Sequence, residues 1–145
     1  MKLIKLAPVV VAVILSACSS AKQAEPVAEK AQAVNTAPTE KTIAYSCQGK
    51  KSIVAHYYFE GENAVKADVT LGKKVTKDLT RDTNNADFAA FASGKYVWHV
   101  DSPLALATAE KTNAVNLTLK GKSSDRLLVK DCSVNAAATA KLASK

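Results

Sequence analysis

The three cysteines are the residues of this 145-residue chain whose type and spacing could do chemistry. Cys18, Cys47 and Cys132 lie far apart, and no Cys-x-x-Cys pair occurs. A thiol in this pattern can be acylated, joined in a disulfide or left reduced, whereas a zinc site needs more closely spaced ligands. His56 and His99 are isolated in the sequence, so we predict neither a metal site nor a cofactor.

Cys18 ends a segment that is typical of a secretory signal. A basic start is followed by the apolar run Leu6–Leu15, which is too short to cross a bilayer of about 30 Å. Leu15-Ser16-Ala17-Cys18 resembles the bacterial lipobox, in which the cysteine thiol becomes acylated. We predict a signal peptide over residues 1–17 and a lipid on Cys18. The alternative is an ordinary signal that ends near a cysteine by chance.

The residue after the predicted lipidation site also indicates where the protein is located in the cell. Ser19, rather than an aspartate, follows Cys18 and resembles the pattern of lipoproteins that are sorted to an outer membrane. Two or more acyl chains hold a protein on a membrane stably. We therefore expect a lipid-anchored protein of the bacterial outer membrane, on either of its faces.

If Cys18 carries lipid, Cys47 and Cys132 remain as a pair in an oxidising compartment. A bond between them would close a loop of about 85 residues, for which the chain-entropy model gives roughly 4 to 5 kcal/mol of stabilisation. Two unpaired buried thiols are the alternative.

Composition divides the mature chain into three parts. Residues 18–41 hold Cys18 and a segment without aromatic residues, which predicts a flexible tether. Residues 42–134 hold every aromatic residue and predict one small domain. Residues 135–145 are rich in alanine, and either a frayed helix or disorder is expected. The net charge of +7 is scattered without a Lys/Arg cluster, so nucleic acid is not an expected partner.

Apolar and polar residues alternate with period two through residues 42–134, which is typical of strands with one buried face. Gly72-Lys73 suits a two-residue hairpin turn. Many short strands separated by turns indicate antiparallel pairing. We predict an all-β fold, a small antiparallel β-barrel of about eight strands closed by one disulfide. The strands expected individually are Thr42–Cys47, Ser52–Phe59, Val65–Leu71, Lys74–Leu79, Lys95–Val100, Val115–Lys120 and Arg126–Cys132.

No catalytic motif is present in the sequence. It contains no Gly-x-Ser-x-Gly segment and no phosphate-binding glycine loop. His56 and His99 fall inside strand patterns, where half-exposed histidines are ordinary. We therefore expect a binding module and not an enzyme.

Two segments at the ends of the domain carry a family resemblance. Lys41–Lys51 and Val129–Ser133 resemble the corresponding segments of the Neisseria adhesin complex protein family. That family is similar to the membrane-bound and periplasmic (MliC- and PliC-like) inhibitors of c-type lysozyme. The resemblance implies an eight-stranded antiparallel barrel with a disulfide between the two ends of the domain.

Ala92–Tyr96 is similar to the Ser-Gly-x-Arg/Lys-Tyr loop with which those inhibitors enter the lysozyme cleft. The resemblance implies that Ser93, Gly94, Lys95 and Tyr96 contact lysozyme. A Ser93 hydroxyl and a Lys95 ammonium suit the two catalytic carboxyl groups of such an enzyme. The alternative is that Ser93-Gly94 is only a turn before the next strand.

The chain departs from the inhibitor pattern in two places. The loop is one residue shorter, and Trp98–Asp101 lacks the Lys-Gly of a second inhibitor motif. Because c-type lysozymes are typically basic, a basic domain gains no long-range attraction to them. We expect local complementarity from Asp82, Asp87 and Asp101 around the loop.

The resemblance implies two kinds of protein partner. A c-type lysozyme is the first, and a host cell surface bound by an adhesin is the alternative. Tyr57 and Tyr58 are expected to form an exposed pair that suits adhesion, although core packing explains at least one of them. A structural envelope lipoprotein with neither activity is a third possibility.

Replacing the acylated thiol tests the lipid anchor. Cys18→Ala should release or mislocalise the protein, because no other predicted feature attaches it to a membrane. Fractionation of cells into membrane and soluble pools measures this. Continued recovery of the Cys18→Ala variant in the membrane pool would contradict the lipoprotein assignment.

Overall fold

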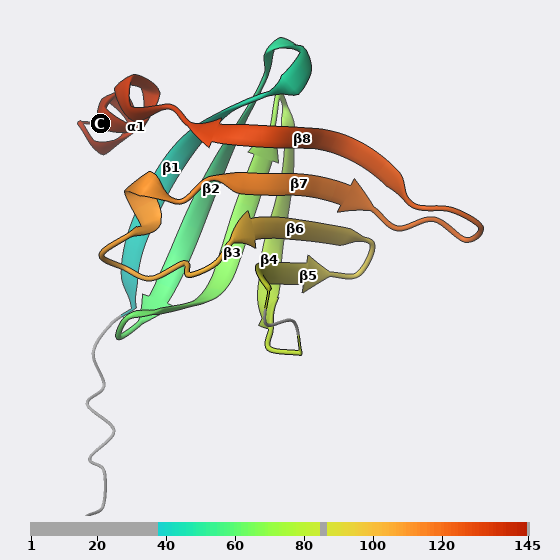
Figure 1. Ribbon diagram of the computed structural model, residues 1–145, viewed down its shortest axis with the longest axis horizontal. Helices are drawn as coiled ribbons and strands as arrows, with labels where there is room; N and C mark the ends of the chain where they lie inside the picture. The colour runs from blue at the N-terminus through green and yellow to red at the C-terminus, as the bar shows by residue number, and fades with distance from the viewer. Residues whose placement is uncertain (1–37, 85–86, 145) are drawn as a thin grey trace, which may run out of the picture. The chain divides into compact units, whose positions relative to one another are not determined.

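The computed structural model describes residues 38–84 and 87–144. Within these ranges eight strands form a closed antiparallel barrel, each pairing with its neighbours in the chain and β8 pairing with β1 (Figure 1). This confirms the predicted fold. The strands are β1 (Thr39–Cys47), β2 (Lys51–Glu60), β3 (Asn63–Leu71), β4 (Lys74–Asp82), β5 (Phe88–Ser93), β6 (Tyr96–Asp101), β7 (Ala114–Leu119) and β8 (Arg126–Val134).

Helical segments occur only at the edges of the described barrel. A 3-10 turn, η1 (Gln48–Lys50), joins β1 to β2, and a second, η2 (Ala109–Lys111), lies between β6 and β7. The alanine-rich tail forms a short helix, α1 (Ala136–Ala143), which decides between the two expectations for that segment. The first strand begins at Thr39, three residues before the domain boundary predicted at residue 42.

Alternating burial along β2 follows the predicted pattern. The inward side chains are at most 1% exposed, namely Ile53, Ala55, Tyr57 and Phe59. The outward side chains are half-buried, namely Val54, His56 and Tyr58. Burial of large apolar side chains on one face drives the sheet to close around them.

Two β-bulges shift the inward face from where simple alternation predicts it. Tyr58 pairs with Lys66 but Phe59 pairs with Ala64, so Val65 is an extra residue and Ala64 points inward. His99 of β6 pairs with Asn116 but Val100 pairs with Ala114, so Val115 of β7 is an extra residue and Ala114 is buried in its place. The prediction that Val65 and Val115 face the core is therefore wrong.

β5 was not expected as an individual strand. Its sequence begins Phe88-Ala89-Ala90-Phe91, in which the aromatic residues are three apart and the period of two is hidden. Ala89 and Ala90 are both buried, so this strand is covered on both faces. Pairing with β4 and β6 sets its conformation.

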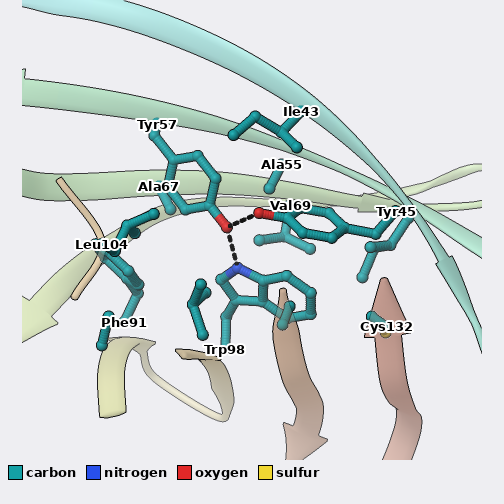
Figure 2. Packing of buried hydrophobic residues seen from close by; sticks show 14 of the residues in the cluster. Ile43, Tyr45, Ala55, Tyr57, Ala67, Val69, Phe91, Trp98, Leu104 and Cys132 are labelled. Atoms are coloured by element: carbon teal, nitrogen blue, oxygen red, sulfur yellow. Dashed lines mark hydrogen bonds between the residues drawn. The ribbon is translucent and has the colours of Figure 1, made fainter. Parts of the chain in front are cut away.

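Three aromatic side chains share hydrogen bonds at the centre of the core (Figure 2). Trp98 Nε1 donates to Tyr57 Oη at 2.8 Å, and Tyr57 Oη lies 3.0 Å from Tyr45 Oη. None of the three is more than 1% exposed. Burial raises the pKa of Tyr45 to about 12 and that of Tyr57 well above its usual range. The network therefore stays neutral and fully paired.

The seam between β1 and β8 is short. Only Tyr45↔Val134 and Ser46↔Ser133 pair across it. The predicted disulfide Cys47–Cys132 lies beside this seam, so the two thiols are joined and not reduced. The structure thereby links the end of β1 to the end of β8, as the cysteine pattern predicted.

Helix α1 continues the seam where strand pairing stops. Asn135 N donates to Ala44 O at 2.8 Å, and Ala44 N donates to Thr139 Oγ1 at 3.0 Å. The Asn135 side chain also caps α1 by accepting from Ala138 N at 3.0 Å. The tail thus satisfies backbone groups of β1 that β8 does not reach.

Removing the disulfide tests its contribution to closure. Cys47→Ser combined with Cys132→Ser should lower the free energy of unfolding by roughly 4 to 5 kcal/mol, because an 85-residue loop in the unfolded chain is released. Denaturant titration measures this, and reduction of the wild-type protein should give the same loss. An unchanged unfolding midpoint would contradict the predicted contribution.

Removing one hydroxyl tests the aromatic network. Tyr57→Phe leaves Trp98 Nε1 buried without an acceptor, so we expect a loss of about 1–3 kcal/mol in the free energy of unfolding. Tyr58→Phe is the matched control, because its hydroxyl is bonded to Asp68 at the surface. A loss for Tyr57→Phe no larger than that of the control would contradict the role of the network.

The same hydroxyls predict how stability depends on alkaline pH. The folded-state pKa values of Tyr45 and Tyr57 are raised above the unfolded value of about 10. The stability linked to them is fully present below pH of about 10 and is lost as pH rises through the folded-state values. Stability measured across this range should fall less steeply in Tyr57→Phe than in the wild type. Equal slopes would contradict the assignment.

Candidate functional site

The β5–β6 turn contains the residues that the sequence predicted as a contact loop. Ser93 pairs with Tyr96, which leaves Gly94-Lys95 as a two-residue turn. Gly94 has a φ of +53°, a conformation that glycine adopts without strain. Gly94 and Lys95 are exposed, while Ser93 and Tyr96 are half-buried. All four predicted residues are therefore together on a short, regular hairpin tip.

Neighbouring strands hold this hairpin tip in place. Lys120 N donates to Lys95 O at 2.6 Å, and Tyr96 pairs with Leu119 of β7. The Lys74 ammonium lies 4.8 Å from the centre of the Tyr96 ring, a cation–π contact that connects the β3–β4 turn to β6. Sequence reasoning missed Lys74 and Lys120 because both contacts join turns that are distant in the chain.

The tip can supply a cation, a hydroxyl and exposed backbone to a partner. The Lys95 ammonium forms no ion pair within the described residues. Ser93 ends β5, and its hydroxyl lies at the barrel edge beside the turn. The β7–β8 hairpin projects farther from the barrel than this turn does (Figure 1).

Two of the three expected acidic residues lie away from the tip. Asp101 pairs with Phe88 at the far end of the β5–β6 hairpin, about 17 Å from Tyr96 along the strand, and Asp87 precedes β5. Asp82 pairs with Ala90 and lines, together with Ala92, Val97 and Lys120, a hollow beside the turn. The expectation of acidic residues around the turn is therefore wrong for Asp87 and Asp101 and holds for Asp82.

Of the two tyrosines expected as a pair, one is in the core, as the core-packing explanation stated, so they do not form an exposed pair. Tyr57 is fully buried in the aromatic network, and only Tyr58 lies on the outer face. The two are adjacent in a strand, so their side chains point to opposite faces of the sheet. Tyr58 is occupied by a hydrogen bond to Asp68 Oδ2 at 3.2 Å and by the Lys66 ammonium over its ring.

A groove of about 550 Å³ lies between α1 and the outer face of β1 and β2. His56 lines it, with Nδ1 2.6 Å from Thr42 Oγ1 and Nε2 3.0 Å from Glu40 Oε2. Lys41 pairs with Glu110 at 2.6 Å beside the groove, and this hydrogen bond holds the pKa of Glu110 below its usual range. The polar side chains of the groove are thus engaged with one another.

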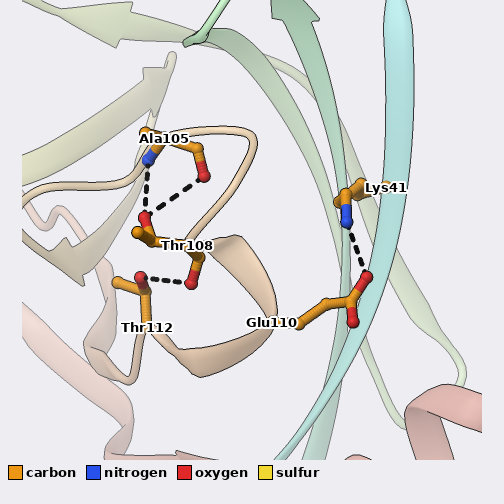
Figure 3. Close-up of polar contacts among 5 residues, drawn as sticks. All are labelled: Lys41, Ala105, Thr108, Glu110 and Thr112. Atoms are coloured by element: carbon orange, nitrogen blue, oxygen red, sulfur yellow. Dashed lines mark hydrogen bonds and ion pairs between the residues drawn. The ribbon is translucent and has the colours of Figure 1, made fainter.

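The η2 segment that borders this groove is fixed by threonine hydroxyls (Figure 3). Thr108 Oγ1 accepts from Ala105 N at 3.2 Å, and Thr112 Oγ1 donates to Thr108 O at 2.9 Å. Glu110 is therefore presented to Lys41 on an ordered turn. His56 was predicted as an ordinary strand residue. In the structure its ring contacts the side chains of Thr42 and Glu40, and neither of these is a strongly nucleophilic group.

The remaining predicted features concern the N-terminal segment, metal binding and membrane spans. Cys18, the signal peptide over residues 1–17 and most of the tether lie outside the described residues. In residues 38–84 and 87–144, no cluster of His, Cys, Asp and Glu could hold a metal ion. The same part of the chain has no helix long and apolar enough to cross a bilayer.

The fold and the disulfide place the protein in the class of small, disulfide-closed antiparallel barrels. Within that class, the chain belongs to the ACP-like domain family, whose Nm-ACP model matches residues 41–134. This agrees with the predicted resemblance to the Neisseria adhesin complex protein family. Those residues include both disulfide cysteines and the whole β5–β6 turn.

A relative shows that the likeness is not confined to the barrel. An uncharacterized protein of Haemophilus influenzae is 45% identical over 150 aligned positions, which cover 97% of this chain and 98% of the relative. The two proteins are thus similar over almost their whole lengths.

Proposed function

We propose that this protein inhibits a c-type lysozyme by inserting the β5–β6 turn into the active-site cleft of the enzyme. The observation that carries the proposal is the Lys95 ammonium, which is exposed at the tip of a two-residue turn and forms no ion pair within the described residues. A turn this narrow fits a cleft that is built to hold a single polysaccharide strand.

The chemistry of the cleft suits the side chains of the turn. A lysozyme of this kind works with two carboxyl groups, one protonated and one ionised. Lys95 can pair with the ionised group, and Ser93 can hydrogen-bond the other. Exclusion of water from the cleft strengthens both interactions. Binding is stoichiometric, and the inhibitor undergoes no chemical change.

The support for the turn reduces the cost of binding. Pairing of Ser93 with Tyr96 and the bond from Lys120 N to Lys95 O order the tip before a partner arrives. A preorganised loop loses less conformational entropy on association. The Lys74 ammonium over the Tyr96 ring further restricts the aromatic side chain beside the turn.

We also propose that the protein is attached to the outer membrane by a lipid on Cys18. β1 begins at Thr39, at the end of the barrel opposite the β5–β6 turn, because consecutive turns alternate between the two ends. The β5–β6 turn is therefore at the end of the barrel that does not carry the junction with the predicted tether.

Titration against lysozyme tests the proposed function. A soluble form comprising residues 35–145, which holds the complete barrel, should suppress lysis of bacterial cell walls by an animal c-type lysozyme near one-to-one stoichiometry. Lys95→Ala should weaken inhibition by about tenfold or more, because an ion pair in a water-excluded cleft is lost. Ser93→Ala should have a smaller effect.

Lys111→Ala is the matched control, because it removes an exposed lysine at the opposite end of the barrel. It should inhibit like the wild type. Absence of inhibition at micromolar excess of the wild-type domain would overturn the proposal. Adhesion to host cells would then become the leading function to test.

A further inference from the structure

We propose that the hairpin tips form a binding surface for an acidic polysaccharide, independently of lysozyme inhibition. The surface consists of a basic rim, defined by Lys73, Lys74, Lys95, Lys120, Lys122 and Arg126, and of a hollow beside it on the outer face of β5, β6 and β7. The rim supplies cations for the acid groups, and the hollow accommodates a sugar ring.

The topology gathers cations that are scattered in the sequence. The β3–β4, β5–β6 and β7–β8 turns all lie at the same end of a barrel whose strands run alternately up and down. Two contacts connect them directly, namely the Lys74 ammonium over the Tyr96 ring and the hydrogen bond from Lys120 N to Lys95 O. Three turns therefore present one continuous basic edge.

The charge of the rim is not neutralised from within. Of its six cations only Lys74 has a side-chain contact, with the Tyr96 ring, and none forms an ion pair in the described residues. Asp125 is the one carboxylate in residues 71–75, 93–96 and 119–127, and its Oδ1 accepts from Gly121 N at 3.2 Å. Like charges held together in this way repel one another, and an anionic partner relieves that repulsion.

The hollow of about 250 Å³ is bordered by Lys120 and by two carboxylates, Asp82 and Asp125. Its floor is apolar because Ala92 and Val97 pair with one another across β5 and β6. A cavity of this size is smaller than those that hold drug-sized ligands and suits a single sugar ring. The apolar floor can pack against the C–H face of such a ring.

Polar groups at the side of the hollow are arranged to bind hydroxyls. Asn116 Oδ1 accepts from Thr118 Oγ1 and lies 3.0 Å from His99 Nδ1, which leaves the Asn116 amide nitrogen as a donor. His99 Nε2 remains available on the other side of the ring. A small apolar floor flanked by an amide, an imidazole and the carboxylates of Asp82 and Asp125, which can accept from sugar hydroxyls and repel phosphate, favours a carbohydrate over a lipid headgroup or inorganic polyphosphate.

Charge-reversal variants test the rim. The domain of residues 35–145 should bind a heparin oligosaccharide with an affinity that falls as salt increases. Lys73→Glu/Lys122→Glu/Arg126→Glu should weaken binding by about tenfold or more and flatten the salt dependence, because three cations are removed. The control Lys41→Glu/Lys111→Glu/Lys141→Glu lies at the opposite end of the barrel, changes net charge equally and should lose less than about threefold. Equal losses in the two variants would overturn the proposed surface.

Filling the hollow tests the polysaccharide assignment. Ala92→Leu adds bulk without charge and should weaken heparin binding by about fivefold while leaving polyphosphate binding unchanged. Circular dichroism should show that all variants remain folded. An Ala92→Leu variant that binds heparin like the wild type, or wild-type protein that binds polyphosphate or anionic vesicles as tightly as heparin, would overturn the assignment.

The design separates this inference from the proposed function. The rim variant retains Ser93, Lys95 and Tyr96, so its lysozyme inhibition should persist. Loss of heparin binding with intact inhibition supports two distinct partners. Failure of the wild type to bind heparin overturns this inference and leaves the lysozyme proposal to its own titration.

Discussion

Closure of the barrel at the β1–β8 seam is the constraint on which the rest of the structure depends. Two residue pairs join these strands, which is too few to hold the first and last strands of an eight-stranded barrel by themselves. The Cys47–Cys132 disulfide and the hydrogen bonds from α1 to Ala44 complete the seam. Once it is closed, the buried Tyr45–Tyr57–Trp98 network connects β1, β2 and β6 across the interior.

Closure also gives the barrel two different ends. One end carries the start of β1, the Lys41–Glu110 pair and the groove beside α1, where opposite charges are already paired. The other end carries short glycine turns and cations, including Lys95 and Lys122, that form no ion pair with any residue the structure describes. Groups without internal partners can bind external ones at a lower desolvation cost than groups that must first be separated. This asymmetry is why both proposed interactions are placed at the hairpin-tip end.

The sequence predicted the fold well because the alternation of apolar residues, the turn glycines and the cysteine spacing can be read directly from the chain. Ile53 to Phe59 and the Gly72 turn follow directly from them. Bulges at Val65 and Val115 were missed because a register shift is set by the partner strand.

The functional site was predicted less completely than the fold. Ser93–Tyr96 was found through resemblance. The basic rim could not be recognised from the sequence, because its cations are tens of residues apart in the chain. Asp87 and Asp101 were misplaced because sequence proximity does not reveal at which end of a hairpin a residue lies.

The central claim is that the hairpin-tip end, through the β5–β6 turn, is the functional end of the barrel. Backbone amide NMR of residues 35–145 during titration with a c-type lysozyme tests it most directly. The account predicts that the largest shifts occur at Gly94, Lys95 and Tyr96, with smaller shifts at Lys120. Shifts confined to the groove beside α1, around Thr42 and Thr139, with an unchanged turn, would contradict it.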